Sequence, residues 1–227
     1  MNFTCKFCNK SYTKESTLAS HLCEPKRRFN QRSEQGVQIG FNAWLRFFEL
    51  TQGSAKLKNY DDFCVSPFYI AFVRYGRYLI DIKAVNVKSF TDWLLQNNHK
   101  LDNWTKDSLY LTWLNEYIKK EPVQDAIERA LKEMQEYADK NPDQLGSFND
   151  YFRSVNGNRI AFHISTGRIS PWVVYNCKSG LEWLGQILPE QLSAIMTSID
   201  PDYWQKRFKD FLADAEWCKS ILEKAGL

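Results

Sequence analysis

The chain has 227 residues and a formal net charge of +3, with 44% hydrophobic and 15% aromatic residues. This composition provides enough apolar side chains for a large packed core and excludes a mostly disordered chain. No window of about 18 residues is both apolar and uncharged, which excludes a membrane-spanning helix. The N-terminus also lacks the apolar run of a signal peptide, so we expect a protein that works inside a cell.

The charge is unevenly distributed along the chain. Residues 1–36 contain seven Lys and Arg against three Glu, whereas the remaining residues contain 23 positive and 24 negative side chains. The whole basic excess therefore lies on the N-terminal segment. A local excess of this kind favours an anionic partner at that end of the chain.

The six cysteines form two groups. One group lies close together near the N-terminus, and the members of the other stand singly among apolar residues. The first group is Cys5, Cys8 and Cys23, and the second is Cys64, Cys177 and Cys218. A disulfide framework has denser and more regular spacing, so we expect the first group to bind metal and the second to be buried as small hydrophobic side chains.

The stretch FTCKFCNKSYTKESTLASHLC, from Phe3 to Cys23, combines Cys-x2-Cys with a later histidine. Apolar residues stand before, between and after these positions. The three metal-ligand candidates are Cys5, Cys8 and His21, and the apolar residues are Phe3, Tyr12 and Leu18. This pattern resembles the Cys2His2 zinc finger. The resemblance implies a ββα module in which a hairpin presents two thiolates and one helix brings a histidine to the same Zn²⁺, without which so short a segment does not fold.

The segment departs from the family pattern at the fourth ligand. The family places a second histidine three to five residues after the first, but residues 25–27 are Pro, Lys and Arg. Cys23 can replace it if the helix ends at His21 and the chain turns at Leu22. Pro25 favours such an early end, because the residue before a proline disfavours helix. We therefore predict a Cys2HisCys site, with water or no ligand in place of Cys23 as the alternative.

The finger and the residues after it indicate a nucleic-acid partner, DNA rather than RNA. The base-reading positions of the family fall on Lys14, Thr17 and Ser20, with Ser16 as an auxiliary position. One finger spans only about 3 base pairs, which is too few for specific binding by itself. The basic run that follows can neutralise phosphates through Lys26, Arg27, Arg28 and Arg32. The alternative is a finger that contacts a protein.

The rest of the chain predicts an all-α, multi-helix globular domain. Residues 29–40 are polar with two glycines and indicate a linker, and residues 41–227 then predict seven to nine helices in one domain. The strongest helical periodicity lies in residues 123–138, and Asp200 with Pro201 predicts the start of a C-terminal helix. Ser179 and Glu182 have the spacing of a capping box. Residues 66–88 fit either a helix or a β-hairpin, and helix is favoured.

Two patterns raise the question of catalysis. Asp81 and Lys83, after the Asp61-Asp62 pair, have the residue types of a metal-dependent nuclease, but that chemistry needs both on one face of a strand. His163 lies in an apolar stretch with no nucleophile or carboxylate at a telling distance, which favours a core histidine. We therefore predict that the protein is not an enzyme.

The helical region resembles uncharacterised proteins of tailed bacteriophages in the stretches SPFYIAFVRYGRYLIDI and GRISPWVVYN. This resemblance implies a role in the host cytoplasm, in phage replication, transcription or packaging. Our leading hypothesis is a non-enzymatic accessory protein whose finger and basic arm bind nucleic acid while the helical domain docks a partner protein. The alternative is a structural or assembly protein whose finger is a clip between proteins.

Overall fold

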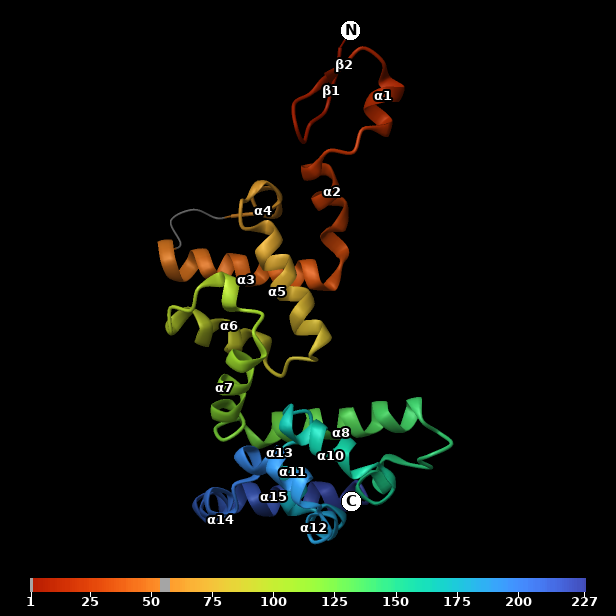
Figure 1. Ribbon diagram of the computed structural model, residues 1–227, viewed down its shortest axis with the longest axis vertical. Helices are drawn as coiled ribbons and strands as arrows, with labels where there is room; N and C mark the ends of the chain where they lie inside the picture. The colour runs from red at the N-terminus through yellow and green to blue at the C-terminus, as the bar shows by residue number, and fades with distance from the viewer. Residues whose placement is uncertain (1, 54–57) are drawn as a thin grey trace. The chain divides into compact units, whose positions relative to one another are not determined.

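The computed structural model describes residues 2–53 and 58–227 and divides into two compact units, Met1–Tyr110 and Leu111–Leu227. Helices form almost all of its regular structure, and the sheet in these ranges has two short strands near the N-terminus (Figure 1). This confirms the predicted all-α class with a small ββα module. None of the helices in the described ranges is both long and apolar enough to cross a membrane.

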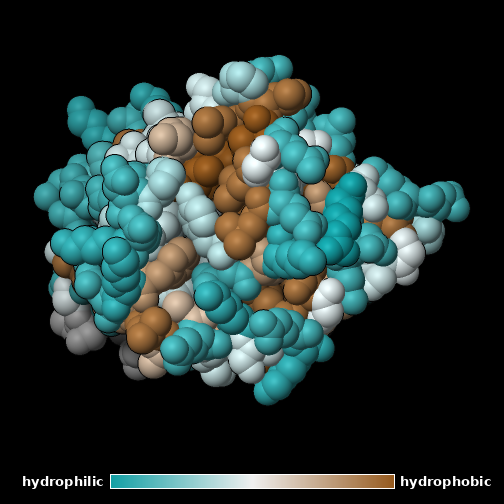
Figure 2. Space-filling model, turned by 90° about the horizontal axis from the view of Figure 1, so that it is seen from below, coloured by the Kyte–Doolittle hydropathy of each residue, from teal (hydrophilic) through white to brown (hydrophobic). Residues whose placement is uncertain are grey.

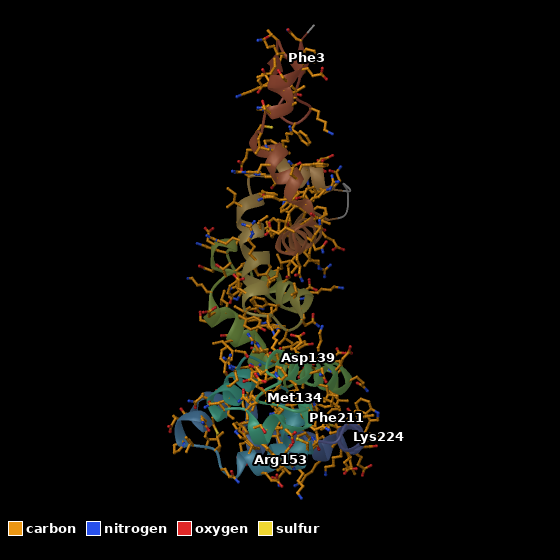
Figure 3. The ribbon with its side chains drawn as sticks, turned by 90° about the vertical axis from the view of Figure 1, so that its right-hand side faces the viewer. Phe3, Met134, Asp139, Arg153, Phe211 and Lys224 are labelled. Atoms are coloured by element: carbon orange, nitrogen blue, oxygen red, sulfur yellow. The ribbon has the colours of Figure 1, made fainter. Side chains whose placement is uncertain are left out.

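The first unit begins with the ββα module. Strands β1 (Phe3–Thr4) and β2 (Ser11–Tyr12) pair antiparallel, and helix α1 (Glu15–Ser20) follows. Phe3 lies opposite Tyr12 in this hairpin, and Figure 3 labels Phe3 on the module. The remaining elements are α2 (Glu24–Asn30), η1 (Gln31–Ser33), α3 (Gln35–Gln52), α4 (Tyr60–Val65), α5 (Tyr69–Asp81), α6 (Val87–Gln96) and η2 (Leu101–Asn103).

The segment predicted to be a linker, residues 29–40, is mostly helical. It comprises the end of α2, all of η1 and the first turns of α3. Its two glycines lie four residues apart on one face of α3, against Gly76 of α5. A Cβ atom on Gly76 would lie 2.7 Å from the Gly40 amide nitrogen, and one on Gly36 would lie 2.7 Å from Cγ of Arg77. The glycines therefore permit two helix backbones to touch, a contact that a single segment of sequence does not reveal.

Large aromatic side chains form the core of the first unit. Trp44, Phe63, Phe72, Tyr75 and Trp104 are each at most 2% exposed. Phe72 and Tyr75 belong to α5, so the uncertain stretch 66–88 contains α5 and the start of α6. The stretch is therefore helical and not a β-hairpin, and its aromatic and β-branched residues are buried against neighbouring helices.

The second unit is entirely helical in its described regular structure. Helix α7 (Asp107–Tyr117) crosses the boundary between the units and leads to α8 (Val123–Lys140). The other elements are η3 (Phe148–Asp150), α9 (Tyr151–Ser154), α10 (Gly157–Ser165), α11 (Pro171–Asn176), α12 (Lys178–Leu184), α13 (Pro189–Ile199), α14 (Pro201–Asp210) and α15 (Leu212–Lys224). The range 41–227, which the sequence predicts as one domain, therefore includes parts of both units. The sequence gives no sign of the boundary at residue 110, because it lies within a helix and has no linker-like composition.

Two of the three helix predictions in the second unit are confirmed, and one is wrong. The periodic face of α8 is buried, including Met134, which is completely inaccessible and is labelled in Figure 3. Asp200 caps α14 as predicted, by accepting from the amide of Asp202. The capping box at Ser179 was wrong, because α12 begins at Lys178 and the Cys177 sulfur accepts from the amide of Gly180.

Hydrophobic side chains also reach the surface of the second unit. Leu181, Leu188, Phe211 and Leu212 are 43–60% exposed. In the view of Figure 2, hydrophobic residues gather into a patch bordered by hydrophilic ones. Phe211, labelled in Figure 3, is the residue at which the expected C-terminal helix breaks into α14 and α15.

Candidate metal centre

The four predicted ligands converge at one point of the ββα module. One donor atom from each of Cys5, Cys8, His21 and Cys23 lies within 4.8 Å of the others. The Cys5 and Cys23 sulfurs are 3.9 Å apart, and the Cys8 sulfur is 3.2 Å from Nε2 of His21. Two sulfurs bound to one tetrahedral Zn²⁺ at about 2.3 Å would be about 3.8 Å apart. The group therefore fits a metal ion, and Cys23 stands at the fourth position as predicted.

The hairpin holds the first two thiols through its backbone. The amide of Cys5 donates to the carbonyl of Lys10 at 2.9 Å, and the amide of Asn9 donates to the carbonyl of Cys5 at 2.8 Å. Asn9 has φ 57°, a left-handed conformation that asparagine tolerates better than most residues. This turn is tight enough to place Cys5 and Cys8 side by side.

The same turn adjusts the two thiols differently. Desolvation acts to raise the pKa of Cys5, but hydrogen bonds from the backbone of Phe7 and Cys8 outweigh it, so the pKa lies below its ordinary value. A backbone hydrogen bond from Lys10 acts to lower the pKa of Cys8, but desolvation and the neighbouring thiols raise it overall. The hairpin thus favours the thiolate form, the metal-binding form, at Cys5.

His21 is oriented by a residue that the sequence indicated only as core. The hydroxyl of Tyr12 lies 2.8 Å from Nδ1 of His21, on the ring edge opposite the thiols. A metal ion at Nε2 leaves the proton on Nδ1, which then donates to the Tyr12 oxygen. Partners of this kind fix the tautomer and ring orientation of metal-binding histidines. Phenylalanine would fill the core equally well at position 12, so the presence of tyrosine there is the sequence feature that indicates a role for its hydroxyl.

The end of the finger helix differs in detail from the expectation. Helix α1 ends at Ser20, so His21 already has extended backbone, with φ −67° and ψ 123°. Cys23 is the N-cap residue of α2, and Pro25 lies in the first turn of that helix. The early end at the histidine is confirmed, and the proline that signalled it starts the next helix, where its missing amide hydrogen is not needed.

The predicted base-reading residues lie on the surface of the finger helix. Lys14 precedes α1 as its N-cap residue, and Thr17 follows three positions later; both are exposed. Ser20 is exposed too, but its hydroxyl donates to the carbonyls of Ser16 and Thr17. Lys14 and Thr17 therefore present polar groups to solvent on one side of α1, and neither side chain has a hydrogen-bond partner among residues 2–53 and 58–227.

The basic run divides into structural and exposed side chains, because it forms helix α2. Lys26 donates to the carbonyl of His21 at 2.8 Å and so closes the end of α1. Arg28, with a side chain only 15% exposed, donates to the carbonyl of Cys64 at 2.9 Å and lies over the ring of Tyr69. Both cations hold the fold.

Arg27 and Arg32 remain at the surface. The side chain of Arg27 is 58% exposed and pairs with Glu24. Arg32 is also exposed, and its guanidinium lies 4.4 Å from the centre of the Phe29 ring. Ion pairs this exposed contribute little to stability, so both guanidinium groups are accessible to an anionic partner.

No protein-family model, curated protein or solved structure matches this chain. The resemblance to the Cys2His2 finger therefore rests on the converging ligands, and the resemblance to tailed-phage proteins has no support beyond the quoted stretches.

The residues considered for catalysis lie apart from the metal centre in the sequence. Asp81 ends α5 and Lys83 follows in a turn with φ 50°, so the strand that the nuclease pattern needs is missing from the described residues around them. His163 is 2% exposed, and its Nδ1 lies 2.6 Å from the Tyr151 hydroxyl. The burial predicted for this histidine is confirmed, but the expectation that no carboxylate lies near it is wrong, because Oε1 of Glu133 is 3.9 Å from its Nε2.

Proposed function

We propose that the protein is a non-enzymatic, zinc-dependent nucleic-acid-binding accessory protein. The observation that carries this proposal is the convergence of three cysteines and one histidine within 4.8 Å of one another, next to exposed basic side chains. Three thiolates and one imidazole in tetrahedral arrangement are typical of structural zinc sites, whereas Mg²⁺ and Ca²⁺ prefer oxygen ligands. Zinc would hold α1 and the start of α2 in place.

The exposed cations Arg27 and Arg32 are the proposed contacts to phosphate. Arg27 and Arg32 carry guanidinium groups, whose forked donors match a phosphate. The finger helix offers Lys14 and Thr17 to bases, a limited set that supports general binding, with DNA as the preferred partner. The second unit, with its exposed hydrophobic side chains, is the proposed docking element for a partner protein.

Metal content and binding can be tested together. Purified protein should contain one equivalent of zinc, and Co²⁺ substitution should give the absorption of a tetrahedral thiolate site. Fluorescence anisotropy with single-stranded DNA, duplex DNA and RNA of equal length, over a salt series, should show affinity that falls with salt. Cys5→Ser should remove both the cobalt spectrum and binding.

A matched pair of variants separates the basic surface from overall charge. Lys14→Gln, Arg27→Gln and Arg32→Gln together remove two proposed phosphate contacts, so the slope of log K against log salt should become less negative by up to about 1.8 for duplex DNA. The control replaces three exposed lysines elsewhere in the first unit, Lys88, Lys100 and Lys106, by Gln. It should leave the slope almost unchanged. Binding that is insensitive to salt, or no binding to any oligonucleotide, refutes the proposal.

One observation favours a second function, a zinc-dependent clip onto a protein. Leu22, between two of the ligands, is 61% exposed. An apolar side chain that the ligands on both sides hold at the surface offers apolar area that a protein partner would bury. Under this function Leu22→Ser should abolish capture of a protein partner, while the triple Gln variant retains it.

A further inference from the structure

Helices α2 and α5 enclose an open groove of about 590 Å³ in the first unit. The α2 wall presents Glu24, Arg27 and Arg28, whose spacing puts them on one helix face. The α5 wall presents Arg74, Arg77 and Asp81, spaced at three and four residues. Four guanidinium groups therefore line one concavity that contains only two carboxylates.

The arginines of the groove differ in how far they are already engaged. Arg27 and Arg28 both pair with Glu24, and Arg28 is also held by the Cys64 carbonyl. Arg77 makes two hydrogen bonds to Glu34, at 2.7 and 2.9 Å, with half of its side chain exposed. Arg74 is exposed and has no salt-bridge partner within residues 2–53 and 58–227. An arginine without a carboxylate partner, beside further guanidinium groups, is a strong point of attraction for a phosphate.

The groove is continuous with the metal centre along the chain. Cys23 is the N-cap of α2, so the first charged residue of the groove, Glu24, directly follows a metal ligand. Helix α2 is also fixed to the rest of the unit, because the Tyr60 hydroxyl donates to the carbonyl of Arg28 at 2.9 Å. A nucleic-acid strand bound at the finger would therefore contact helix α2, whose position relative to α4 and α5 is set by hydrogen bonds from Tyr60 and Tyr69.

We propose that the groove between α2 and α5 holds the sugar-phosphate backbone of the nucleic acid, with Arg74 and Arg77 as phosphate contacts. This inference rests on the proposed nucleic-acid-binding function and extends it to a second surface. Arg27 contributes from the opposite wall, and Arg28 positions that wall. The seven residues of α2 extend about 10 Å, a length over which duplex DNA carries about six charges.

The charge of residues 41–227 is nearly balanced, so composition gave no sign of this site. Arg74 and Arg77 of α5 form a groove only together with α2, whose arginines Arg28 and Arg27 lie 46 and 50 positions earlier in the chain. They are placed on the groove side of α5 because its opposite face is buried, with Phe72 and Leu79 inaccessible.

The test compares Arg74→Glu and Arg74→Lys with Lys100→Glu, an equal charge reversal at an exposed site outside the groove. Anisotropy of labelled duplex and single-stranded DNA is measured against salt concentration. Arg74→Glu should weaken binding at least about tenfold near 0.1 M salt and make the slope of log K against log salt less negative by about 1. Arg74→Lys should restore most of the affinity. Lys100→Glu should change affinity less than about threefold.

The outcomes distinguish this inference from the function on which it rests. If wild-type protein binds but Arg74→Glu behaves like Lys100→Glu, the groove is not a binding surface, and the proposed function stands on the finger and basic arm alone. If zinc-loaded wild-type protein binds no oligonucleotide, both fail. The cobalt spectrum and circular dichroism of each variant should match wild type, because residue 74 is exposed and remote from the ligands in sequence.

Discussion

The crossing of α3 and α5 predicts a severe effect of one methyl group. In Gly76→Ala, the new Cβ would lie 2.7 Å from the Gly40 nitrogen and 3.0 Å from the Gly36 carbonyl carbon, with the Gly36 oxygen closer still. Contacts between carbon and other heavy atoms are favourable at about 3.5–4.0 Å, so the helices must separate by about 1 Å. All three atoms belong to the backbone, so no side chain can rotate to make room.

The expected loss follows from two opposing terms. Overpacking of a tight contact costs about 3 kcal/mol when the backbone has to move. Alanine in place of glycine gains about 1 kcal/mol of helix propensity. We therefore expect Gly76→Ala to lower the free energy of unfolding of the first unit by about 2 kcal/mol, which corresponds to a fall in Tm on the order of 10 °C.

Thermal and urea unfolding followed by circular dichroism measure this difference. Gly146→Ala, in the second unit, is the control for the added methyl group itself, because no heavy atom lies within 4 Å of the position its Cβ would take. It should be neutral or stabilising by up to about 1 kcal/mol, through the reduced entropy of the unfolded chain. If Gly76→Ala is as stable as wild type, the two helix backbones are not in contact and the account of this crossing is wrong.

Three further predictions concern the metal centre and the second unit. Tyr12→Phe keeps the aromatic ring but removes the partner of His21, so zinc affinity, measured by competition with a chelator, should fall about 10- to 100-fold; unchanged affinity would exclude the orienting role. At pH 8, iodoacetamide should alkylate Cys5, Cys8 and Cys23 only after chelation of the metal, as counted by mass spectrometry. Burial raises the pKa of Cys64, Cys177 and Cys218, the last to about 12, and keeps them unreactive until the protein unfolds; early modification of these three would contradict their burial. Arg129→Met removes the hydrogen bonds of 2.6 and 2.8 Å from the guanidinium to the inaccessible carboxylate of Glu121 and leaves it only the bond from the Ser170 hydroxyl at 3.0 Å. The variant should destabilise the second unit by about 3–5 kcal/mol at pH 7, whereas Lys132→Met should not. Desolvation raises the pKa of the Glu121 carboxyl in the folded protein, so at low pH this carboxyl is protonated and costs less to bury. The loss of unfolding free energy in Arg129→Met should therefore be smaller near pH 4 than at pH 7 and should grow as pH rises. A loss independent of pH would argue against a buried charge.

The ligand set was predictable because the metal centre is local. Cys5, Cys8, His21 and Cys23 lie within 19 consecutive positions, and their spacing already reflects the hairpin and the helix that join them. The sequence predicts Tyr12 as a core position, but it does not show that the hydroxyl lies beside His21, because the tyrosine ring alone satisfies the packing.

The roles of the cations in the basic run depend on tertiary contacts. In the sequence they are indistinguishable, since each is a cation after the finger: Lys26, Arg27, Arg28 and Arg32. Arg28 is distinguished by Cys64, 36 positions later, and Lys26 by the carbonyl of His21. Which cation is free for a phosphate depends on these contacts.

The amino-acid sequence by itself determined the helical class, the ββα module and its four ligands. The helical class follows from periodicity within one or two turns, where the backbone geometry is nearly the same in any protein. The module and its ligands follow from the resemblance of residues 3–23 to the Cys2His2 finger. Tertiary structure decided the division into two units, the conversion of residues 29–40 from linker to packed helix, and the groove that brings Arg74 to α2. Each of these depends on contacts between segments far apart in the chain, such as Gly36 against Gly76, and the free energy of such contacts is set by shape and burial in three dimensions.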